Sequence, residues 1–149
     1  MEFSNEKPIV AITGSAGKTT VKNLVSSVLR EKWVVFESND YNNTTEKTLS
    51  HKERITFIHR AAVLEYGMAY PGVITEHCNI IKPNIGIITN VGLAHIGNFD
   101  GDITKLAAAK SELIEDIESD EMMYINNDDE NAKLLKKADD KGSIYPVWI

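Results

Sequence analysis

The alternation of short apolar runs with segments of helical periodicity constrains the fold of this chain more than any other feature. Strands are predicted at six apolar runs, namely Ile9–Thr13, Trp33–Phe36, Ala61–Glu65, Ile85–Thr89, Met122–Ile125 and Ile144–Trp148. Helices are predicted at four segments, namely Lys18–Arg30, Val73–Cys78, Ile103–Ile117 and Glu130–Ala138. Continuous apolar strands that alternate with helices indicate βαβ units. The predicted fold class is therefore α/β, with a mostly parallel sheet flanked by helices.

The composition narrows the class of protein further. The chain has 149 residues, of which 42% are hydrophobic and 26% charged, as expected for one globular domain. Its single cysteine, Cys78, rules out an internal disulfide and suits the reducing cytosol. No apolar run approaches the roughly 20 residues of a membrane span, and the net charge of −6 argues against a nucleic-acid surface. We therefore expect a soluble, cytoplasmic domain that binds neither membranes nor nucleic acids.

Polar residues follow several of the predicted strands, at the point where each strand ends. In a parallel sheet the carboxyl ends of the strands lie at one edge, and ligands bind beyond that edge. The polar groups expected to meet there are the loop from Gly14, the Asn-rich stretch from Ser38, Glu65, the segment Asn90–His95, and Asn126. The stretch that begins at Ser38 is too polar to be buried. This edge is the predicted functional site.

The loop Thr13-Gly-Ser-Ala-Gly-Lys-Thr-Thr20 indicates a P-loop NTPase-like phosphate site, although it departs from the usual spacing. In the common pattern G-x-x-x-x-G-K-[ST] the first glycine would fall at position 12, which is Ile. A buried strand, a turn permitted by Gly14 and Gly17, and a helix N-terminus are nevertheless all present. Lys18 can reach the β- and γ-phosphates, and the Thr19 hydroxyl is placed to bind Mg²⁺. The alternative is an ordinary strand–turn–helix with a surface lysine.

Three further residues are candidates for chemistry, and each has a simpler structural interpretation. Glu65 ends a predicted strand and suits the magnesium-binding carboxylate of a Walker B strand; otherwise it is a solvated strand terminus. His95 is a candidate metal ligand, although an isolated histidine is more often a hydrogen-bonded structural residue. Lys110 lies on the apolar-leaning side of a predicted helix, and a buried lysine has a lowered pKa and is reactive. A surface lysine is the simpler alternative.

Taken together, six motifs resemble those of the central ATP-binding domain of the Mur ligases, the amide-forming ligases of peptidoglycan precursor synthesis. In chain order the matching segments are Thr13–Thr20, Tyr41–Asn43, Leu64–Gly72, Thr89–His95, Ala109–Leu113 and Ile125–Asp128. Val21-Lys22 after the loop and the pair Asn42-Asn43 resemble the branch that adds a D-alanyl-D-alanine dipeptide to a muramoyl tripeptide. Six motifs in one order are far more specific than the phosphate loop alone.

The resemblance implies a role for each matched residue. The loop Gly14, Ser15, Ala16, Gly17, Lys18, Thr19 and Thr20 would bind ATP, and Asn126 would lie near the adenine. Thr19 and Glu65 would hold a first Mg²⁺ and His95 a second. Lys110 would be the lysine that the family carries as an N-carbamate, an oxygen anion that suits Mg²⁺. Asn43 would lie near the γ-phosphate and the substrate carboxylate.

The implied reaction is ATP-dependent amide formation. ATP phosphorylates a substrate carboxylate, an amine attacks the acyl phosphate, and the amide forms with release of ADP and phosphate. In the family, a preceding domain binds the carboxylate substrate and a following domain binds the amino acid or peptide amine. We expect residues 1–149 to be the central domain, incomplete at its C-terminal end, without those two domains. On its own, such a domain is not expected to complete the ligase cycle.

Two departures and two alternatives remain open. Thr44–Thr48 replaces the Gly and Pro that usually follow the Asn pair, and Phe99–Ile103 replaces an [FY]-G-[ST]-like segment. Both lie on the substrate side, so the sequence leaves the substrate open. The alternatives are a nucleotide-binding module without ligase activity and an unrelated P-loop kinase or NTPase. A simple NTPase has no need of paired His95 and Lys110, whereas the sequence does not decide against the first alternative.

Overall fold

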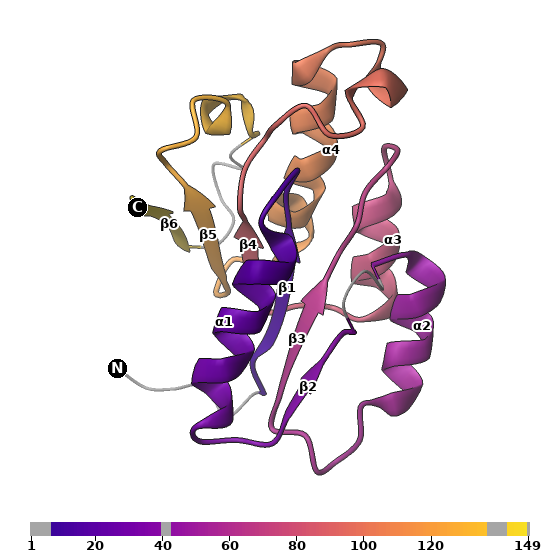
Figure 1. Cartoon of the computed structure of the whole chain (residues 1–149), viewed down its shortest axis with the longest axis vertical. Helices are drawn as coiled ribbons and strands as arrows, with labels where there is room; N and C mark the ends of the chain where they lie inside the picture. The colour runs from indigo at the N-terminus through magenta and orange to yellow at the C-terminus, as the bar shows by residue number, and fades with distance from the viewer. Residues whose placement is uncertain (1–6, 40–42, 137–142, 149) are drawn as a thin grey trace.

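The computed structural model describes residues 7–39, 43–136 and 143–148 and confirms the α/β prediction. Six parallel strands form one sheet in the order β2-β3-β1-β4-β5-β6 (Figure 1). The strands are β1 Ile9–Thr13, β2 Val35–Glu37, β3 Ala61–Glu65, β4 Ile85–Ile88, β5 Met122–Asn126 and β6 Ser143–Val147. The α-helices are α1 Lys18–Arg30, α2 Thr45–Arg54, α3 Val73–Ile80 and α4 Ile103–Asp116, and the short 3₁₀ helices are η1 Ile96–Phe99 and η2 Ala132–Leu134.

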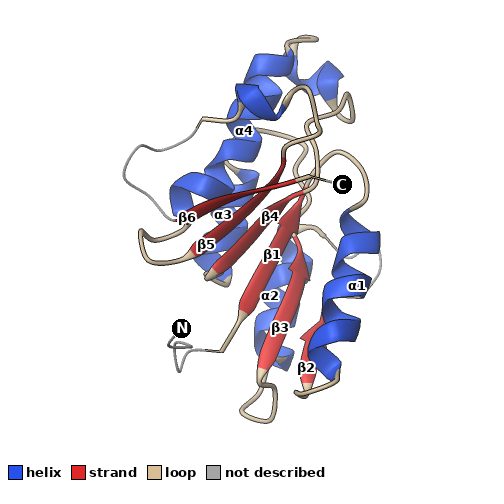
Figure 2. Ribbon diagram, turned by 90° about the vertical axis from the view of Figure 1, so that its left-hand side faces the viewer, coloured by secondary structure: helices blue, strands red, loops and turns tan. Residues whose placement is uncertain are grey.

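The helices form one layer on each face of the sheet. The chain crosses from β1 to β2 in one direction and runs from β2 through β3 to β4 in the other, so right-handed crossovers place α1 on one face and the later helices on the opposite face. Figure 2 shows α1 to the right of the sheet and α3 and α4 to its left. The larger core cluster lies on the side of α2, α3 and α4, and a smaller cluster around Val10, Ile12 and Val63 lies beneath α1. The crossovers before and after β2 run in opposite directions across the sheet, so the carboxyl end of β1 lies at the topological switch point.

The face beneath α1 is covered unevenly. Val10 and Ile12 pair in register with Ile85 and Ile87, and the same rows continue across β5 and β6. Within residues 7–39, 43–136 and 143–148, no helix covers the outer part of this face, where the rings of Tyr124 and Tyr145 stack 5.4 Å apart. The order of the strands therefore leaves an apolar, aromatic half-face beside α1.

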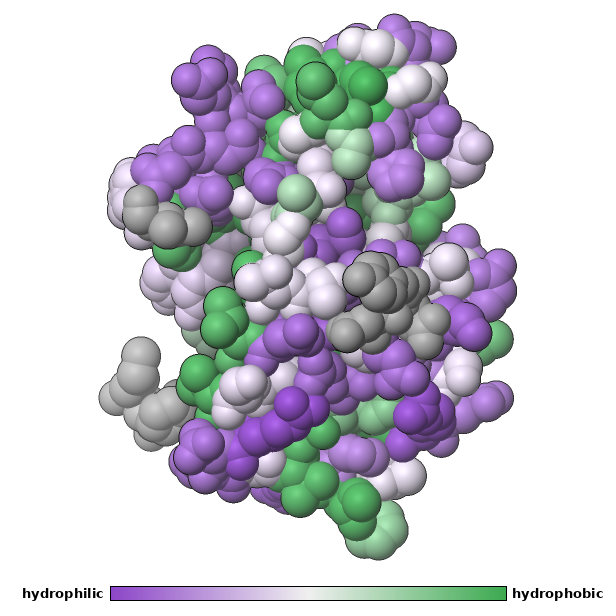
Figure 3. Space-filling model, viewed as in Figure 1, coloured by the Kyte–Doolittle hydropathy of each residue, from purple (hydrophilic) through white to green (hydrophobic). Residues whose placement is uncertain are grey.

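The structure of α1 differs in one detail from the amphipathic pattern that the sequence predicts for it. The fully buried positions are the polar Lys22 and Ser26, whereas Leu24 and Val28 are exposed. Apolar surface appears among the polar surface in the region of α1 (Figure 3). Helical periodicity counts apolar residues and so missed a buried polar face.

Two other expectations were wrong in part, and one helix was not predicted. Ser38 is buried although its stretch was predicted to be exposed, because its main chain continues the β2–β3 ladder. Helix α2 was not predicted, since its buried positions are Thr48 and His51 and not apolar residues. The helix predicted at Glu130–Ala138 is only the 3₁₀ turn η2 within the described residues, which stop at 136 before the next segment.

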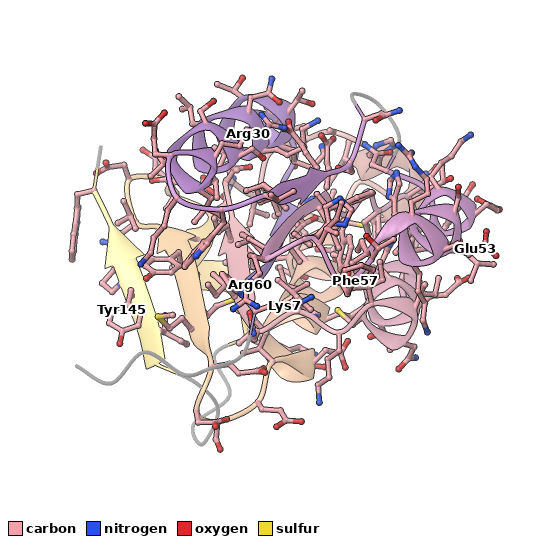
Figure 4. The ribbon with its side chains drawn as sticks, turned by 90° about the horizontal axis from the view of Figure 1, so that it is seen from below. Lys7, Arg30, Glu53, Phe57, Arg60 and Tyr145 are labelled. Carbon is pink, nitrogen blue, oxygen red and sulfur yellow. The ribbon has the colours of Figure 1, made fainter. Side chains whose placement is uncertain are left out.

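The two edges of the sheet differ in character. Figure 4 views the molecule from below, where Lys7, Phe57 and Arg60 lie at the amino ends of the strands, opposite the predicted site. Lys7 and Arg60 are exposed there, and so is the ring of Phe57. None of the helices in the described part of the chain has the length and apolar character that crossing a membrane requires.

Candidate active site

The loop between β1 and α1 has the backbone that a phosphate site requires. Gly14 and Gly17 have φ values of 148° and 79°, which side chains rarely permit. A Cβ atom at Gly14 would lie 1.8 Å from the Thr89 hydroxyl oxygen, so this position needs glycine on steric grounds as well. Gly17 is the N-cap of α1 and provides no side-chain cap. The N-terminus of α1 thus presents uncapped N–H groups and its positive dipole end, which favour an anion.

The segment after β4 holds this loop in place. The Asn90 side-chain oxygen accepts hydrogen bonds from the backbone N–H groups of Ser15 and Ala16, at 2.9 and 3.0 Å. The Ser15 hydroxyl lies 2.9 Å from both the N and O atoms of Gly92. The Thr89 hydroxyl donates to the Ala16 carbonyl at 2.6 Å. These bonds confirm that the strand ends of β1 and β4 meet, and they fix the loop before any ligand binds.

The N–H groups that remain available are those nearest the helix. Among the described residues, the backbone N–H groups of Gly17, Lys18, Thr19 and Thr20 have no hydrogen-bond partner. Those of Ser15 and Ala16 are occupied by Asn90. The structure therefore concentrates the anion-binding capacity of the predicted loop in its last four residues.

Glu65 brings three of the predicted residues together. It ends β3, pairs in register with Ile12 of β1, and is buried. The Thr19 hydroxyl donates to one carboxylate oxygen at 2.8 Å, and the Asn43 amide donates to the other at 2.9 Å. The Lys18 ammonium lies along the loop and donates to the Gly14 carbonyl at 2.8 Å. A carboxylate and a hydroxyl at hydrogen-bond distance form an oxygen donor set that fits Mg²⁺.

Gly67 explains how Asn43 reaches this carboxylate. The N–H group of Gly67 donates to the Asn43 carbonyl at 2.9 Å. A Cβ atom at Gly67 would lie 2.6 Å from the same oxygen, so the close approach requires glycine. Asn43 is the first described residue of its motif match, because Tyr41 and Asn42 lie outside the described residues. The glycine two positions after a strand-end acid was the sequence signal for this contact.

Lys110 is buried, which excludes the simpler interpretation as a surface lysine. Only 2% of its surface is exposed. Burial, together with the smaller effect of the positive charge of Lys18, lowers the pKa of Lys110 from 10.5 to about 8. That electrostatic interaction places Lys110 within range of the phosphate loop. At neutral pH a fraction of the Lys110 amines is therefore uncharged, which an exposed lysine would not show.

His95 and Asn126 do not join the group around Glu65. His95 is exposed and has a left-handed φ of 64°, and its side chain makes no hydrogen bond or ion pair with the described residues. Across the described ranges, no three His, Cys, Asp or Glu side chains are grouped to hold a metal. The Asn126 amide donates to the Thr89 carbonyl at 3.1 Å, and its oxygen accepts from the N–H of Asp128 at 3.0 Å.

Sequence reasoning missed two residues after β5 that hold the segment after β4 in place. Asp129 accepts the N–H of Val91 at 2.6 Å, and the Asn131 amide donates to the Val91 carbonyl at 2.9 Å. Asp129 also accepts the N–H of Asn131. These contacts explain why the predicted helix there is short, because side chains of this type compete for backbone groups. The Asp and Asn residues that follow β5 were the available signal.

Comparison with protein families agrees with this geometry. Residues 12–147 match the family described as the Mur ligase middle domain. The UDP-N-acetylmuramoyl-tripeptide–D-alanyl-D-alanine ligase of Synechocystis is 38% identical over 134 residues, which are 88% of this chain and 28% of that protein. The ligase of the same name from Haemophilus influenzae is 31% identical over 133 residues, with 86% and 29% coverage. The chain thus spans less than a third of the length of these relatives.

Solved structures give the same result. A MurF crystal structure from Acinetobacter baumannii matches with a TM-score of 0.81 at 26% identity, over 93% of this chain and 30% of that one. MurF ligase from Thermotoga maritima, solved in complex with ADP, matches with a TM-score of 0.75 at 26% identity, over 95% and 33%.

Proposed function

The chain belongs to the Mur ligase family, and from this premise we propose that it forms the ATP-binding part of a ligase that joins a carboxylate to an amine through an acyl phosphate. The relatives are named as ligases of D-alanyl-D-alanine and a UDP-N-acetylmuramoyl-tripeptide. We infer the same class of substrates for the whole protein, and hence a role in peptidoglycan synthesis. Because the chain spans under a third of those relatives, the proposal assigns to it the nucleotide chemistry and not the choice of substrate.

The nucleotide would bind with its phosphates at the N-terminus of α1. The four N–H groups from Gly17 to Thr20 supply hydrogen bonds, and the helix dipole adds a favourable field for an anion. The Lys18 ammonium, which donates to the Gly14 carbonyl, has the reach to exchange that partner for a phosphate oxygen. Asn43, whose amide donates to the Glu65 carboxylate, would contact the terminal phosphate and the carboxylate to be phosphorylated.

Thr19 and Glu65 would hold the magnesium ion of the nucleotide. Their oxygen atoms are 2.8 Å apart, and both face the edge where the phosphates would lie. When bound, the ion offsets negative charge on the phosphoryl group in transfer. Glu65 would release the hydrogen bond from Thr19, so that both oxygens become ligands. This chain's contribution is to hold donor, acceptor and ion in line within a preformed edge.

Lys110 and His95 would complete a second magnesium site. The uncharged amine of Lys110 attacks CO₂, an N–C bond forms, and the amine proton leaves to water, which gives an anionic carbamate. The lowered pKa of Lys110 raises the fraction of amine in the reactive form. Two lysine ammonium groups close together disfavour each other, whereas a carbamate and Lys18 attract. A simple P-loop NTPase has no need of His95 and Lys110 together, so they favour a ligase over that alternative.

The convergence of Thr19 and Asn43 on Glu65, beside the N-terminus of α1, is the observation that carries the proposal. The test is calorimetric titration of the 149-residue chain with ATP and Mg²⁺. Lys18→Ala should abolish binding and leave the circular dichroism spectrum unchanged. Lys32→Ala, which removes an exposed lysine at the opposite edge, should bind as the wild type does. Unchanged affinity in Lys18→Ala would contradict the phosphate-loop assignment.

A further inference from the structure

Lys22 is a fully buried lysine that the proposed function leaves unused. It lies in α1, one turn beyond Thr19, and 0% of its surface is exposed. Burial of a charge is unfavourable unless hydrogen bonds and opposite charge compensate, and even a compensated pair is often no more stable than an apolar replacement. Stability alone therefore gives a weak reason for a lysine at this position.

The ammonium group of Lys22 holds the carboxyl end of β2. Its Nζ atom donates to the Ser38 carbonyl at 2.7 Å and lies 3.7 Å from the Glu37 carboxylate. Both contacts are made where β2 ends, at the same edge of the sheet as the phosphate loop. Helix α1, which begins at the loop, is thus linked directly to β2, on the far side of β3.

Ser38 connects the ammonium group of Lys22 to the backbone of Glu65. Ser38 is buried, its N–H group donates to the Val63 carbonyl at 3.0 Å, and its hydroxyl oxygen accepts the N–H of Glu65 at 3.1 Å. The Glu65 carboxylate in turn accepts the Thr19 hydroxyl. A closed ring results, from Thr19 along α1 to Lys22, then to Ser38, Glu65 and back to Thr19.

We propose that Lys22 is a positioning residue, which through Ser38 sets the Glu65 carboxylate opposite the Thr19 hydroxyl and so sets the affinity of this edge for the magnesium ion of the nucleotide. Lys22 touches neither ion nor nucleotide. Its effect is to fix the distance between two ligands that come from different elements, α1 and β3, and magnesium tolerates little departure from its preferred geometry. The inference rests on the proposed function, because it assigns a positioning residue to that same magnesium site.

The test separates metal affinity from nucleotide affinity. Lys22→Met keeps the length and apolar stem of the side chain and removes the ammonium group. Calorimetry with ADP in EDTA measures nucleotide affinity alone, and electron paramagnetic resonance of free Mn²⁺ measures the affinity of the ADP complex for the metal. Lys22→Met should weaken Mn²⁺ binding about tenfold, the lower end for partners of metal ligands, and change ADP affinity in EDTA less than about twofold.

Two more variants frame this result. Ser26→Ala is the matched control, since Ser26 is buried on the same face of α1 and its hydroxyl has no partner among the described residues. Both of its affinities should stay within about twofold of wild type, the usual range for a position outside the ligand network. Ser38→Ala removes the hydroxyl that accepts the Glu65 N–H and keeps Lys22. It should weaken Mn²⁺ binding about threefold with unchanged ADP affinity in EDTA, and it carries the test if Lys22→Met does not fold.

The outcomes distinguish the inference from the function on which it rests. Wild-type affinity for Mn²⁺ in Lys22→Met, or in Ser38→Ala when Lys22→Met does not fold, would overturn the positioning role. An equal loss of both affinities would also overturn it, since that result marks general damage to α1. A wild-type chain that binds ADP with no dependence on the metal would overturn the inference together with the proposed magnesium site. A wild-type chain that does not bind ADP at all would overturn the proposed function itself.

Discussion

The two sides of the candidate site are built differently. On the side of β1 and β3, the phosphate loop is fixed by Asn90, and Glu65 is held between Thr19 and Asn43. On the side of η1, His95 is exposed, and its side chain makes no hydrogen bond or ion pair with the described residues. The first side is organised without a ligand, whereas on the second side the proposed function requires groups that the nucleotide and a modified Lys110 would add. The loop side should therefore tolerate change poorly, and the His95 side should tolerate it well.

The largest difference is expected from one alanine on each side. Gly14→Ala puts a methyl group 1.8 Å from the Thr89 hydroxyl oxygen at a φ of 148°, whereas a Cβ at Gly97, in η1, meets nothing within 4 Å. Gly14→Ala should lower the free energy of unfolding by about 3 kcal/mol, because clash and backbone strain add. Gly97→Ala should change it by less than about 0.5 kcal/mol. Urea denaturation measures both, and similar values would remove the contrast.

The next effect concerns acid stability beneath the loop side. His77 is buried, and its Nε2 lies 3.1 Å from the carbonyl of Gly67, the residue whose N–H group donates to the Asn43 carbonyl. Because the Gly67 carbonyl can only accept a hydrogen bond, Nε2 carries the proton of the neutral ring and donates to it. Nδ1 is therefore the acceptor of the hydrogen bond from the Thr48 hydroxyl, at 2.7 Å. Burial lowers the pKa of His77 from 6.5 to about 4, which keeps the ring neutral.

Because the folded pKa of His77 lies below the unfolded value, the unfolded chain binds more protons between these two values. The free energy of unfolding should therefore fall as the pH drops from 6.5 to about 4, by at most about 1.4 kcal/mol per pH unit. His51, whose pKa burial also lowers, adds to the fall in the same direction. His77→Gln, which keeps both hydrogen-bond functions and does not titrate there, should show a shallower slope in denaturation across this range. An unchanged slope would show that His77 does not titrate as its burial implies.

Lys110 should give a smaller effect, with the same sign of pH dependence but in a higher pH window. Its folded pKa of about 8 lies below 10.5, so the unfolded chain binds more protons in that window and stability should rise with pH there. At pH 7 the buried charge is unfavourable, and Lys110→Met should stabilise the chain by about 2 kcal/mol. Lys105→Met, on the same helix but exposed and paired with Asp100, should change stability by less than about 0.5 kcal/mol. Destabilisation by Lys110→Met would contradict an unmodified, unfavourably buried ammonium.

The sequence anticipated the loop side well, and the physical reason is local. Ile9–Thr13, Lys18–Arg30 and Ala61–Glu65 were predicted with the observed bounds, because each is an apolar run or periodic segment bordered by glycine or a polar residue. The meeting of Thr19 with Glu65 followed from parallel strands ending at one edge. The features that the sequence did not predict involve buried polar residues. Helix α2 and Lys22 contact the core through hydrogen bonds, which a pattern of apolar residues does not reveal.

The His95 side could not be predicted to the same depth. Its motif match identified His95, but a side chain in a left-handed turn takes its direction from the loop that carries it, and spacing does not specify that direction. Asn126 was expected near the adenine, a role that stays a prediction. Its two polar groups bond to Thr89 and Asp128 within the described chain.

The smallest effect is expected at His95. The side chain is exposed and makes no contact of the kinds seen at Glu65, so His95→Ala should change the free energy of unfolding by less than about 0.5 kcal/mol. Its ADP affinity in EDTA, measured by calorimetry, should equal that of wild type. A large loss in either quantity would show that this side is as organised as the loop side.

The central claim is that Glu65, facing Thr19, holds the metal ion of a nucleotide bound at the α1 N-terminus, and calorimetry of Glu65→Gln tests it most directly. Glutamine keeps the shape of the side chain and removes its charge. Mg²⁺ should strengthen ADP binding to wild type, and in Glu65→Gln that gain should vanish while the affinity in EDTA is retained. An equal gain from Mg²⁺ in both proteins would contradict the claim.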